Sequence, residues 1–356
     1  MFLLALFVRV LAIPLSIIEI NPYSKGDANG FEASAIFIAN QLQNGVVPVV
    51  RIRYIYEVWG FLLSPFWLLP GPSAIYARLL IAILGAIAVY NIYVTACWYQ
   101  SSRAGVLAAL PVAFFPSFVL VHATLLREAV VIFGLTTTVR LIFVPSRLKR
   151  FEKFTVVAVA LGLATVVRLD NLPVYLITIF VGILAVYVKN RGRRWALNMT
   201  FLASLVSIPY LIEVLQRIVG FLVMVHGNRA RGRTAYFKHV VPETVAQFVA
   251  FSWIGAMYFY LTPFPWMVSQ PSDLIVFVEA VCNAIYGLAA IKGVRLFLRR
   301  NASGTFALLV GFGLISVFYG VATANVGTAV RHRQMFVWIL YLFGGVYLAH
   351  RVEIRY

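Results

Sequence analysis

The sequence predicts an all-α membrane protein that crosses the bilayer many times, and three observations lead to this fold class. Hydrophobic residues make up 62% of the 356 residues and charged residues only 12%, against about 45–50% and about 25% in soluble domains. A single soluble core cannot hide so large an apolar surplus. The apolar residues also form stretches about 20 residues long, the length of a spanning helix, and Lys and Arg gather between them.

The hydropathy criterion predicts about ten membrane spans. The first stretch has the length of a signal peptide, but no small-residue cleavage site follows it, so we expect a retained span. The expected spans lie near residues 1–20, 74–98, 104–121, 129–145, 154–169, 172–189, 195–214, 273–297, 303–323 and 335–350.

Runs of Lys and Arg indicate the orientation of these spans. They lie at 147–153, 189–194, 292–300 and 351–355, and with ten spans they all fall on one side, which the positive-inside rule makes cytoplasmic. We therefore expect both termini in the cytoplasm and the protein in a plasma membrane, of prokaryotic type. The net charge of +18 then reflects topology and contact with phospholipids, and we expect no nucleic-acid partner because the charges form no single polar face.

Three apolar pieces are too short, too polar or too broken by proline to be spans. They cover residues 31–44, 54–70 and 245–266. Amphipathic helices rich in Trp and Tyr lie in the membrane interface, and the topology places all three on the extracytoplasmic side. We therefore expect one transmembrane domain over 1–356 with two external segments, 21–73 and 215–272.

Acidic residues on the external side are informative because the orientation rule does not account for them. Asp27, in KGDANGFE, is either a helix-start carboxylate favoured by the dipole or a general base at the membrane surface. Glu128, in HATLLREAVVIFG, is either an ion-pair partner or a second site carboxylate, since two acids with separated pKa values suit acid/base chemistry. Glu32, five residues after Asp27, and His122 are candidate substrate-binding residues.

External arginines are the candidate phosphate contacts. Arg168 lies at an outer turn between two expected spans, where an ion pair is the alternative role. Arg331 and Arg333 flank a histidine before the last span, and they suit a phosphate or pyrophosphate because Arg binds these groups bidentately. Contact with ordinary lipid headgroups is the alternative. A further external cluster at 229–233 is expected to contact a headgroup or an acceptor.

The sequence supports no metal site. It contains no GxxxxGK[ST], HExxH or CxxC motif, and its five histidines have no ligand spacing. No cofactor is therefore expected, and a divalent metal is an alternative without sequence support. Cys97 and Cys282 both lie in apolar runs, where we expect small buried hydrophobic residues rather than a disulfide.

Taken in order, these features resemble the GT-C type membrane glycosyltransferases, which use polyprenyl-phosphate-linked sugars and include protein mannosyltransferases and aminoarabinose transferases. The resemblance covers most of the chain as a sequence of short features. They are Arg9 in the first span, Gly26-Asp27 before an amphipathic helix, Arg78 in SAIYARLL, Pro116 in FFPSF, the acidic Glu128, LTPFPW at 261–266 and GTAVRHR at 327–333.

The resemblance implies a helical fold whose external interfacial helices form a cleft, with Asp27 as catalytic base, Glu128 as second carboxylate and Arg331 or Arg333 on phosphate. The expected reaction is inverting transfer of a sugar from a polyprenyl phosphate to a glycan, lipid or protein acceptor. Two alternatives stay open: a lipid-linked glycan polymerase or ligase, and a catalytically degenerate structural or assembly subunit of a membrane complex. The sequence lacks the Asp-x-Asp or Asp-Glu pair of larger members after the first span, which leaves metal use and activity open. The small number of external acids and the smaller external portion support the second alternative.

Overall fold

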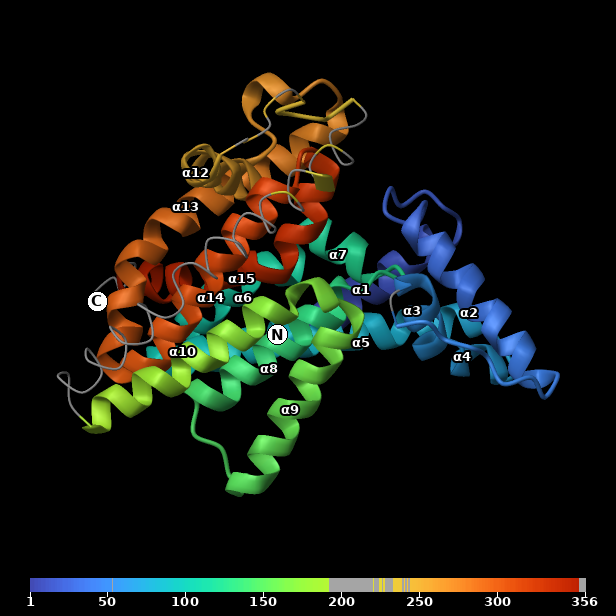
Figure 1. Cartoon of the computed structure of the whole chain (residues 1–356), viewed down its shortest axis with the longest axis horizontal. Coiled ribbons are helices and arrows are strands. Elements are labelled where there is room, and N and C mark those ends of the chain that lie inside the picture. Colours follow the sequence, from blue (N-terminus) through green and yellow to red (C-terminus); the bar gives the residue numbers. More distant parts are fainter. Residues whose placement is uncertain are drawn as a thin grey trace. The chain divides into compact units, whose positions relative to one another are not determined.

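The computed structural model describes residues 1–52, 54–191 and 244–351, together with residues 220, 224, 225, 227, 233–238, 240 and 242. The described residues are 81% helical, and they contain no strand beyond an isolated antiparallel bridge between Ala235 and Asn325. The all-α fold class is therefore confirmed. Figure 1 shows the succession of helices along the chain.

In the described part of the chain, four helices are long and apolar enough to cross a membrane, which supports an integral membrane protein. They are α5 (Ser73–Tyr99), α10 (Leu172–Arg191, preceded by the 3₁₀ turn η1, Leu169–Asn171), α13 (Pro271–Arg300) and α14 (Ala302–Ala322). A fifth span results if α6 (Ser102–Phe114) and α7 (Pro116–His122), which are bent by 61°, are taken together. The count of ten spans is not confirmed, and the expected span at 195–214 lies outside the described residues.

The other expected spans coincide with helices that are shorter or more charged. Helix α1 (Phe2–Ile17) has 16 residues, as does α8 (Glu128–Phe143). Charged residues occupy the first turn of α9 (Arg150–Val167) and the first half of α15 (Val326–Arg351). Length and charge therefore separate these four helices from the clear spans.

The chain divides into two compact units. Unit 1 comprises residues 1–170, 286–293 and 338–356, and it contains α1 to α9. Unit 2 comprises residues 171–285 and 294–337, and it contains α10, α12 (Val245–Leu261), the 3₁₀ turn η2 (Pro265–Met267), α14 and parts of α13 and α15.

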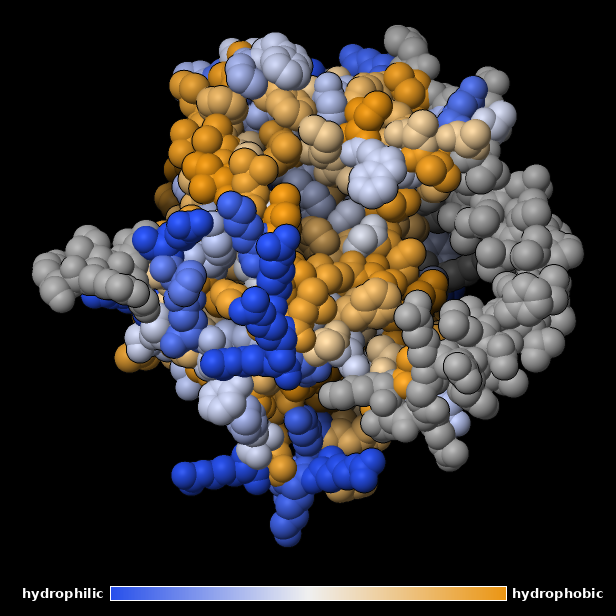
Figure 2. Space-filling model, turned by 90° about the vertical axis from the view of Figure 1, so that its left-hand side faces the viewer, coloured by the Kyte–Doolittle hydropathy of each residue, from blue (hydrophilic) through white to orange (hydrophobic). Residues whose placement is uncertain are grey.

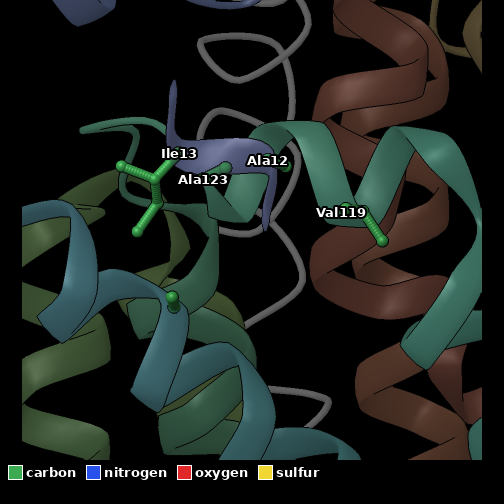
Figure 3. Packing of buried hydrophobic residues seen from close by; sticks show 5 residues of the cluster. Ala12, Ile13, Val119 and Ala123 are labelled. Carbon is green, nitrogen blue, oxygen red and sulfur yellow. The ribbon is translucent and has the colours of Figure 1, made fainter. Parts of the chain in front are cut away.

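Within unit 1, small residues let α1 pack against α5 and α7. Ala12 and Ile13 of α1 form a buried cluster with Ala82 of α5, Val119 of α7 and Ala123, and Figure 3 shows four of them labelled along the crossing helices. Small side chains of this kind allow helices in a membrane to approach closely. The cluster fixes α1 beside the bent α6–α7 pair.

The external segment expected at 21–73 forms three helices that pack together in unit 1. They are α2 (Asp27–Gln43), α3 (Ile55–Leu63) and α4 (Pro65–Leu68), and Figure 1 shows them grouped in blue near one end of α5. Pro65 is the first residue of α4, a position at which proline is common because its missing N–H would have no partner within the helix. Helix α2 starts at Asp27, four residues before the start of the expected helical segment 31–44.

The described surface exposes apolar side chains in a pattern that suits lipid. On α10, Leu176, Phe180 and Ile183 are 57%, 64% and 65% exposed, and their spacing places them along one helix face. Figure 2 shows wide apolar areas on one face of the molecule, with the most hydrophilic side chains gathered in clusters. Continuous apolar surface of this kind is rare on water-soluble monomers.

Candidate functional site

Asp27 begins helix α2, and the turn before it depends on a glycine. Gly26 has a φ of 67°, which a residue with a side chain rarely adopts. The Asp27 carboxylate is half-buried in the first turn, where the helix dipole favours a negative charge. The Tyr56 hydroxyl of α3 donates a hydrogen bond of 2.5 Å to Asp27 Oδ1, so the carboxylate has a defined orientation.

Two contacts position Tyr56 for this hydrogen bond. Its ring lies 4.8 Å from that of the buried Phe31 on α2. On the same helix, a Cβ built on Gly30 would lie 2.6 Å from Tyr56 Cε1, so a larger residue at position 30 would displace the ring. The role of Tyr56 is not predictable from the sequence, because its partner lies 29 residues away and the segment YIYEVW gives no local signal.

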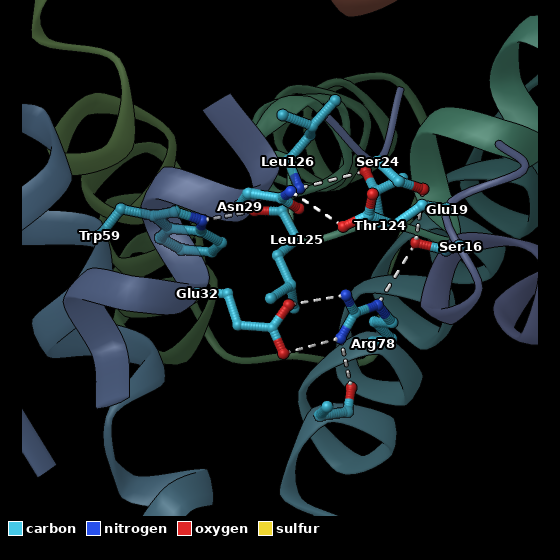
Figure 4. A network of polar contacts seen from close by, with 11 residues as sticks. Ser16, Glu19, Ser24, Asn29, Glu32, Trp59, Arg78, Thr124, Leu125 and Leu126 are labelled. Atoms are coloured by element: carbon cyan, nitrogen blue, oxygen red, sulfur yellow. Dashed lines mark hydrogen bonds and ion pairs between the residues drawn. The ribbon is translucent and has the colours of Figure 1, made fainter. Parts of the chain in front are cut away.

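Glu32 is held by an arginine from a different helix. Arg78 of α5 donates from Nη2 to Glu32 Oε2 at 2.8 Å, and its Nε lies 3.3 Å from Ser16 Oγ at the end of α1. Figure 4 shows Glu32, Arg78 and Ser16 in one network. Arg78 is 4% exposed. Its ion pair fixes α2 against α5, and its contact with Ser16 connects both helices to the end of α1.

The loop before α8 is fixed to the same helices. Trp59 of α3 donates from its indole nitrogen to the Leu125 carbonyl at 2.7 Å, which Figure 4 also shows. The Arg127 guanidinium lies over the Phe31 ring at 5.1 Å and donates to the Val167 carbonyl at 2.7 Å. The predicted site residues at 27–32 and at 122–128 therefore belong to one packed region of unit 1.

Glu128 and Arg168 form a buried ion pair. Arg168 Nη2 lies 2.9 Å from Glu128 Oε1, and the two side chains are 4% and 0% exposed. The pair connects the start of α8 to the end of α9, across 40 residues of sequence. The ion-pair role that the sequence left open for both residues is therefore present in the structure, and any second role of Glu128 stays a prediction.

His122 lies in a buried cluster with Arg9. Arg9 donates to the Val112 carbonyl at 2.7 Å, and its Nε lies 3.3 Å from His122 Nδ1. Since guanidinium has no acceptor, His122 Nδ1 carries the lone pair and Nε2 carries the proton. Pro116 explains the Val112 contact, because it has no N–H to offer the carbonyl four residues earlier.

Arg331 and Arg333, the two arginines expected to bind phosphate, both belong to unit 2 and differ in exposure. Arg333 is 2% exposed and donates to the carbonyls of Tyr260, at 3.1 Å, and Thr262. Arg331 is partly exposed. Of the expected headgroup cluster, positions 229 and 231 lie outside the described residues, and Arg233 forms a bidentate pair with Asp273 at 2.9 and 3.0 Å.

Taken together, unit 1 places Asp27, Glu32, Glu128, Arg168 and His122 in one packed region, of which Asp27 is the partly exposed acid at a helix start. In the described part of the chain, no three His, Cys, Asp or Glu side chains lie together as metal ligands. Comparisons with models of protein families, with curated protein sequences and with solved structures find no match. The resemblance to GT-C enzymes therefore rests on the order of features along the sequence.

Proposed function

We propose that this membrane protein transfers a sugar from a polyprenyl phosphate to an acceptor hydroxyl at the extracytoplasmic face, with Asp27 as general base. The observation that carries the proposal is the position of the Asp27 carboxylate. It is half-buried at the start of an amphipathic helix, and a tyrosine from the neighbouring helix orients it. A general base needs this combination of access and defined direction.

The proposed chemistry needs few parts. One Asp27 oxygen takes the proton of the acceptor hydroxyl as its oxygen attacks the anomeric carbon. The bond from that carbon to the phosphate oxygen breaks with inversion, and the phosphate leaves with the electron pair. A positively charged side chain beside the departing phosphate would stabilise its negative charge and lower the barrier.

A second candidate function is supported by the other site residues. Glu32, Glu128 and Arg168 form ion pairs within unit 1, and His122 accepts a hydrogen bond from Arg9. Side chains bound to one another in this way can serve folding alone. A degenerate relative, acting as a structural or assembly subunit of a membrane complex, would keep these contacts without using Asp27.

One substitution tests the base assignment. In membranes containing the protein, supplied with polyprenyl-phosphate-linked sugars and candidate acceptors, Asp27→Asn should reduce transfer by about 10²–10⁴-fold. Asn keeps the shape and suits a helix start, so expression should be unchanged. Asp170→Asn, which alters an exposed acid in η1, is the matched control and should stay within about twofold of wild type.

Two results would redirect the proposal. Full activity of Asp27→Asn would exclude Asp27 as the base. If the wild-type protein transfers no sugar and carries no polyprenyl lipid after purification, the subunit function replaces the enzyme.

The proposed orientation places residues 21–73 outside and both termini in the cytoplasm of a plasma membrane. Reporters fused after residues 150 and 300 should give a cytoplasmic signal, while one near residue 329 should give an external signal, because the basic runs remain inside. A cytoplasmic signal at 329 would contradict the external assignment of Arg331.

A further inference from the structure

A cavity of about 470 Å³ lies in unit 1 at the far end of α8 from Glu128. Its lining comes from α5, α8, α9 and the loop between α8 and α9. Arg140, one of its lining residues, is twelve positions after Glu128 on the same helix, which corresponds to roughly 18 Å at 1.5 Å per residue. The cavity is therefore separate from the region around Asp27.

Hydrogen bonds hold a set of donors at this cavity. Arg140 Nη1 donates to Asn91 Oδ1 at 3.0 Å, and Asn91 Nδ2 donates to Thr137 Oγ1 at 2.9 Å. The Arg140 guanidinium also lies over the Tyr90 ring at 5.1 Å. The bond to Asn91 fixes the orientation of the Arg140 guanidinium and uses only Nη1. The remaining N–H groups of Arg140 can therefore bind a ligand.

Thr137 adds a hydroxyl donor to the same wall. Its neighbours Thr136 and Thr138 donate their hydroxyl hydrogens to carbonyls of α8. The oxygen of Thr137 instead accepts from Asn91, which leaves its own hydrogen for a ligand. Arg147, also in the lining, is exposed in the loop after α8.

The charge and the shape of the lining indicate the kind of ligand. The lining contains two arginines and no Asp or Glu, and apolar side chains such as Leu141, Val144 and Val156 complete it. Two guanidinium groups and a hydroxyl are suited to phosphate oxygens. The apolar wall is suited to a hydrocarbon chain attached to that phosphate.

Topology alone does not account for this arrangement. The positive-inside rule requires basic residues in the loops, which the run at 147–153 already supplies. It does not require that Arg140, in the last turn of α8, be held by a buried asparagine of another helix and line a cavity.

We propose that the cavity is a phosphate-binding site, lined by Arg140, Arg147, Asn91 and Thr137, that takes the headgroup of an anionic membrane lipid. The site does not depend on the glycosyltransferase proposal, since it involves neither Asp27 nor its neighbours. A lipid phosphate and a soluble phosphate share the same recognition chemistry. The test therefore uses both.

The experiment measures binding to the purified full-length protein in an uncharged detergent. The probes are dioctanoyl phosphatidic acid, dioctanoylglycerol, which lacks the phosphate, and inorganic phosphate. The variants are Arg140→Gln, Val156→Trp, which fills the cavity and keeps both arginines, and Arg150→Gln. Arg150 is an exposed arginine at the start of α9, outside the cavity lining, and its variant is the matched charge control.

The wild-type protein should bind phosphatidic acid in preference to dioctanoylglycerol. Arg140→Gln should weaken this binding by about tenfold to a hundredfold, the loss expected for a hydrogen bond to a charged group. Val156→Trp should weaken it as well, whereas Arg150→Gln should stay within about twofold of wild type. Inorganic phosphate that binds equally well with the same dependence on Arg140 and Val156 would support the site and assign it a soluble ligand.

Three results would overturn the proposal. The first is equal binding of phosphatidic acid and dioctanoylglycerol. The second is wild-type binding by Val156→Trp, which also decides the question if Arg140→Gln fails to fold. The third is an equal loss in Arg140→Gln and Arg150→Gln, because nonspecific surface attraction would then be sufficient.

Discussion

The buried pair of Glu128 and Arg168 permits a quantitative prediction about unit 1. We consider replacing Glu128 by Leu, Arg168 by Met, and both together. Each single change leaves a charge in a site where the side chains are 4% and 0% exposed. Breaking a buried ion pair on one side typically costs about 3–5 kcal/mol, whereas replacing both partners by apolar residues is often neutral.

Each single variant removes one partner of the same buried pair. In Glu128→Leu, the buried Arg168 guanidinium loses the carboxylate that it binds, and we expect a cost of about 3–5 kcal/mol. In Arg168→Met, the fully buried Glu128 carboxylate loses the guanidinium, and we expect a cost in the same range.

The measurement is the free energy of unfolding in mixed micelles, combined in a double-mutant cycle. The double variant should be more stable than either single variant. The pair of Arg51 and Glu57, whose side chains are 60% and 24% exposed, is the surface control, and substituting it should change stability little. Additive costs at 128 and 168 would refute the reasoning, because the two charges would then not depend on each other. Sugar transfer by a stable double variant would show that Glu128 serves structure alone.

Two glycines give further predictions about packing. A Cβ at Gly85 would lie 2.5 Å from His122 Nδ1, so Gly85→Val should cost about 1–3 kcal/mol or more in unfolding free energy; wild-type stability would contradict the buried Arg9–His122 cluster. A Cβ at Gly320 would lie 2.5 Å from a backbone nitrogen of α12, while one at Gly313, on the same helix, meets no atom within 4 Å. Gly320→Leu should therefore destabilise the protein by a similar amount and Gly313→Leu should not, and equal effects would exclude close packing of α12 on α14.

The sequence predicts the positions of helices better than it predicts which helices and side chains contact each other. The expected spans at 74–98 and 303–323 agree within one residue at each end with α5 and α14, because a continuous apolar run has clear ends. The expected span at 104–121 instead bends by 61°. Pro116 begins α7 at this break, and a hydropathy window does not register the missing N–H.

Candidate site residues show where prediction from a single sequence stops. The position of Asp27 at a helix start could be expected from its neighbours, since a glycine precedes it and acids favour this position. Its contact with Tyr56 and the pairing of Glu32 with Arg78 could not, because these partners are 29 and 46 residues apart. Hydropathy and charge patterns carry no information about which distant helices meet.

In each unit, a buried arginine donates hydrogen bonds to backbone carbonyls near the end of a helix: Arg9 in unit 1 and Arg333 in unit 2. A buried backbone carbonyl needs a hydrogen-bond donor, because burial removes the water that would otherwise bind it. Helix α6 is followed by Pro116, and Arg9 donates to the carbonyls of Val112 and Ala113. Helix α12 is followed by Pro263, and Arg333 donates to the carbonyls of Tyr260 and Thr262.

This common role changes how the arginines in the GT-C resemblance should be tested. An arginine that donates to two buried carbonyls is expected to stabilise the fold, and lysine, with one compact charge, does not reproduce its fork. Loss of activity in Arg333→Lys would therefore not identify a phosphate contact unless stability were unchanged. Arg331 is partly exposed, so the phosphate assignment is better tested there, with stability measured beside activity.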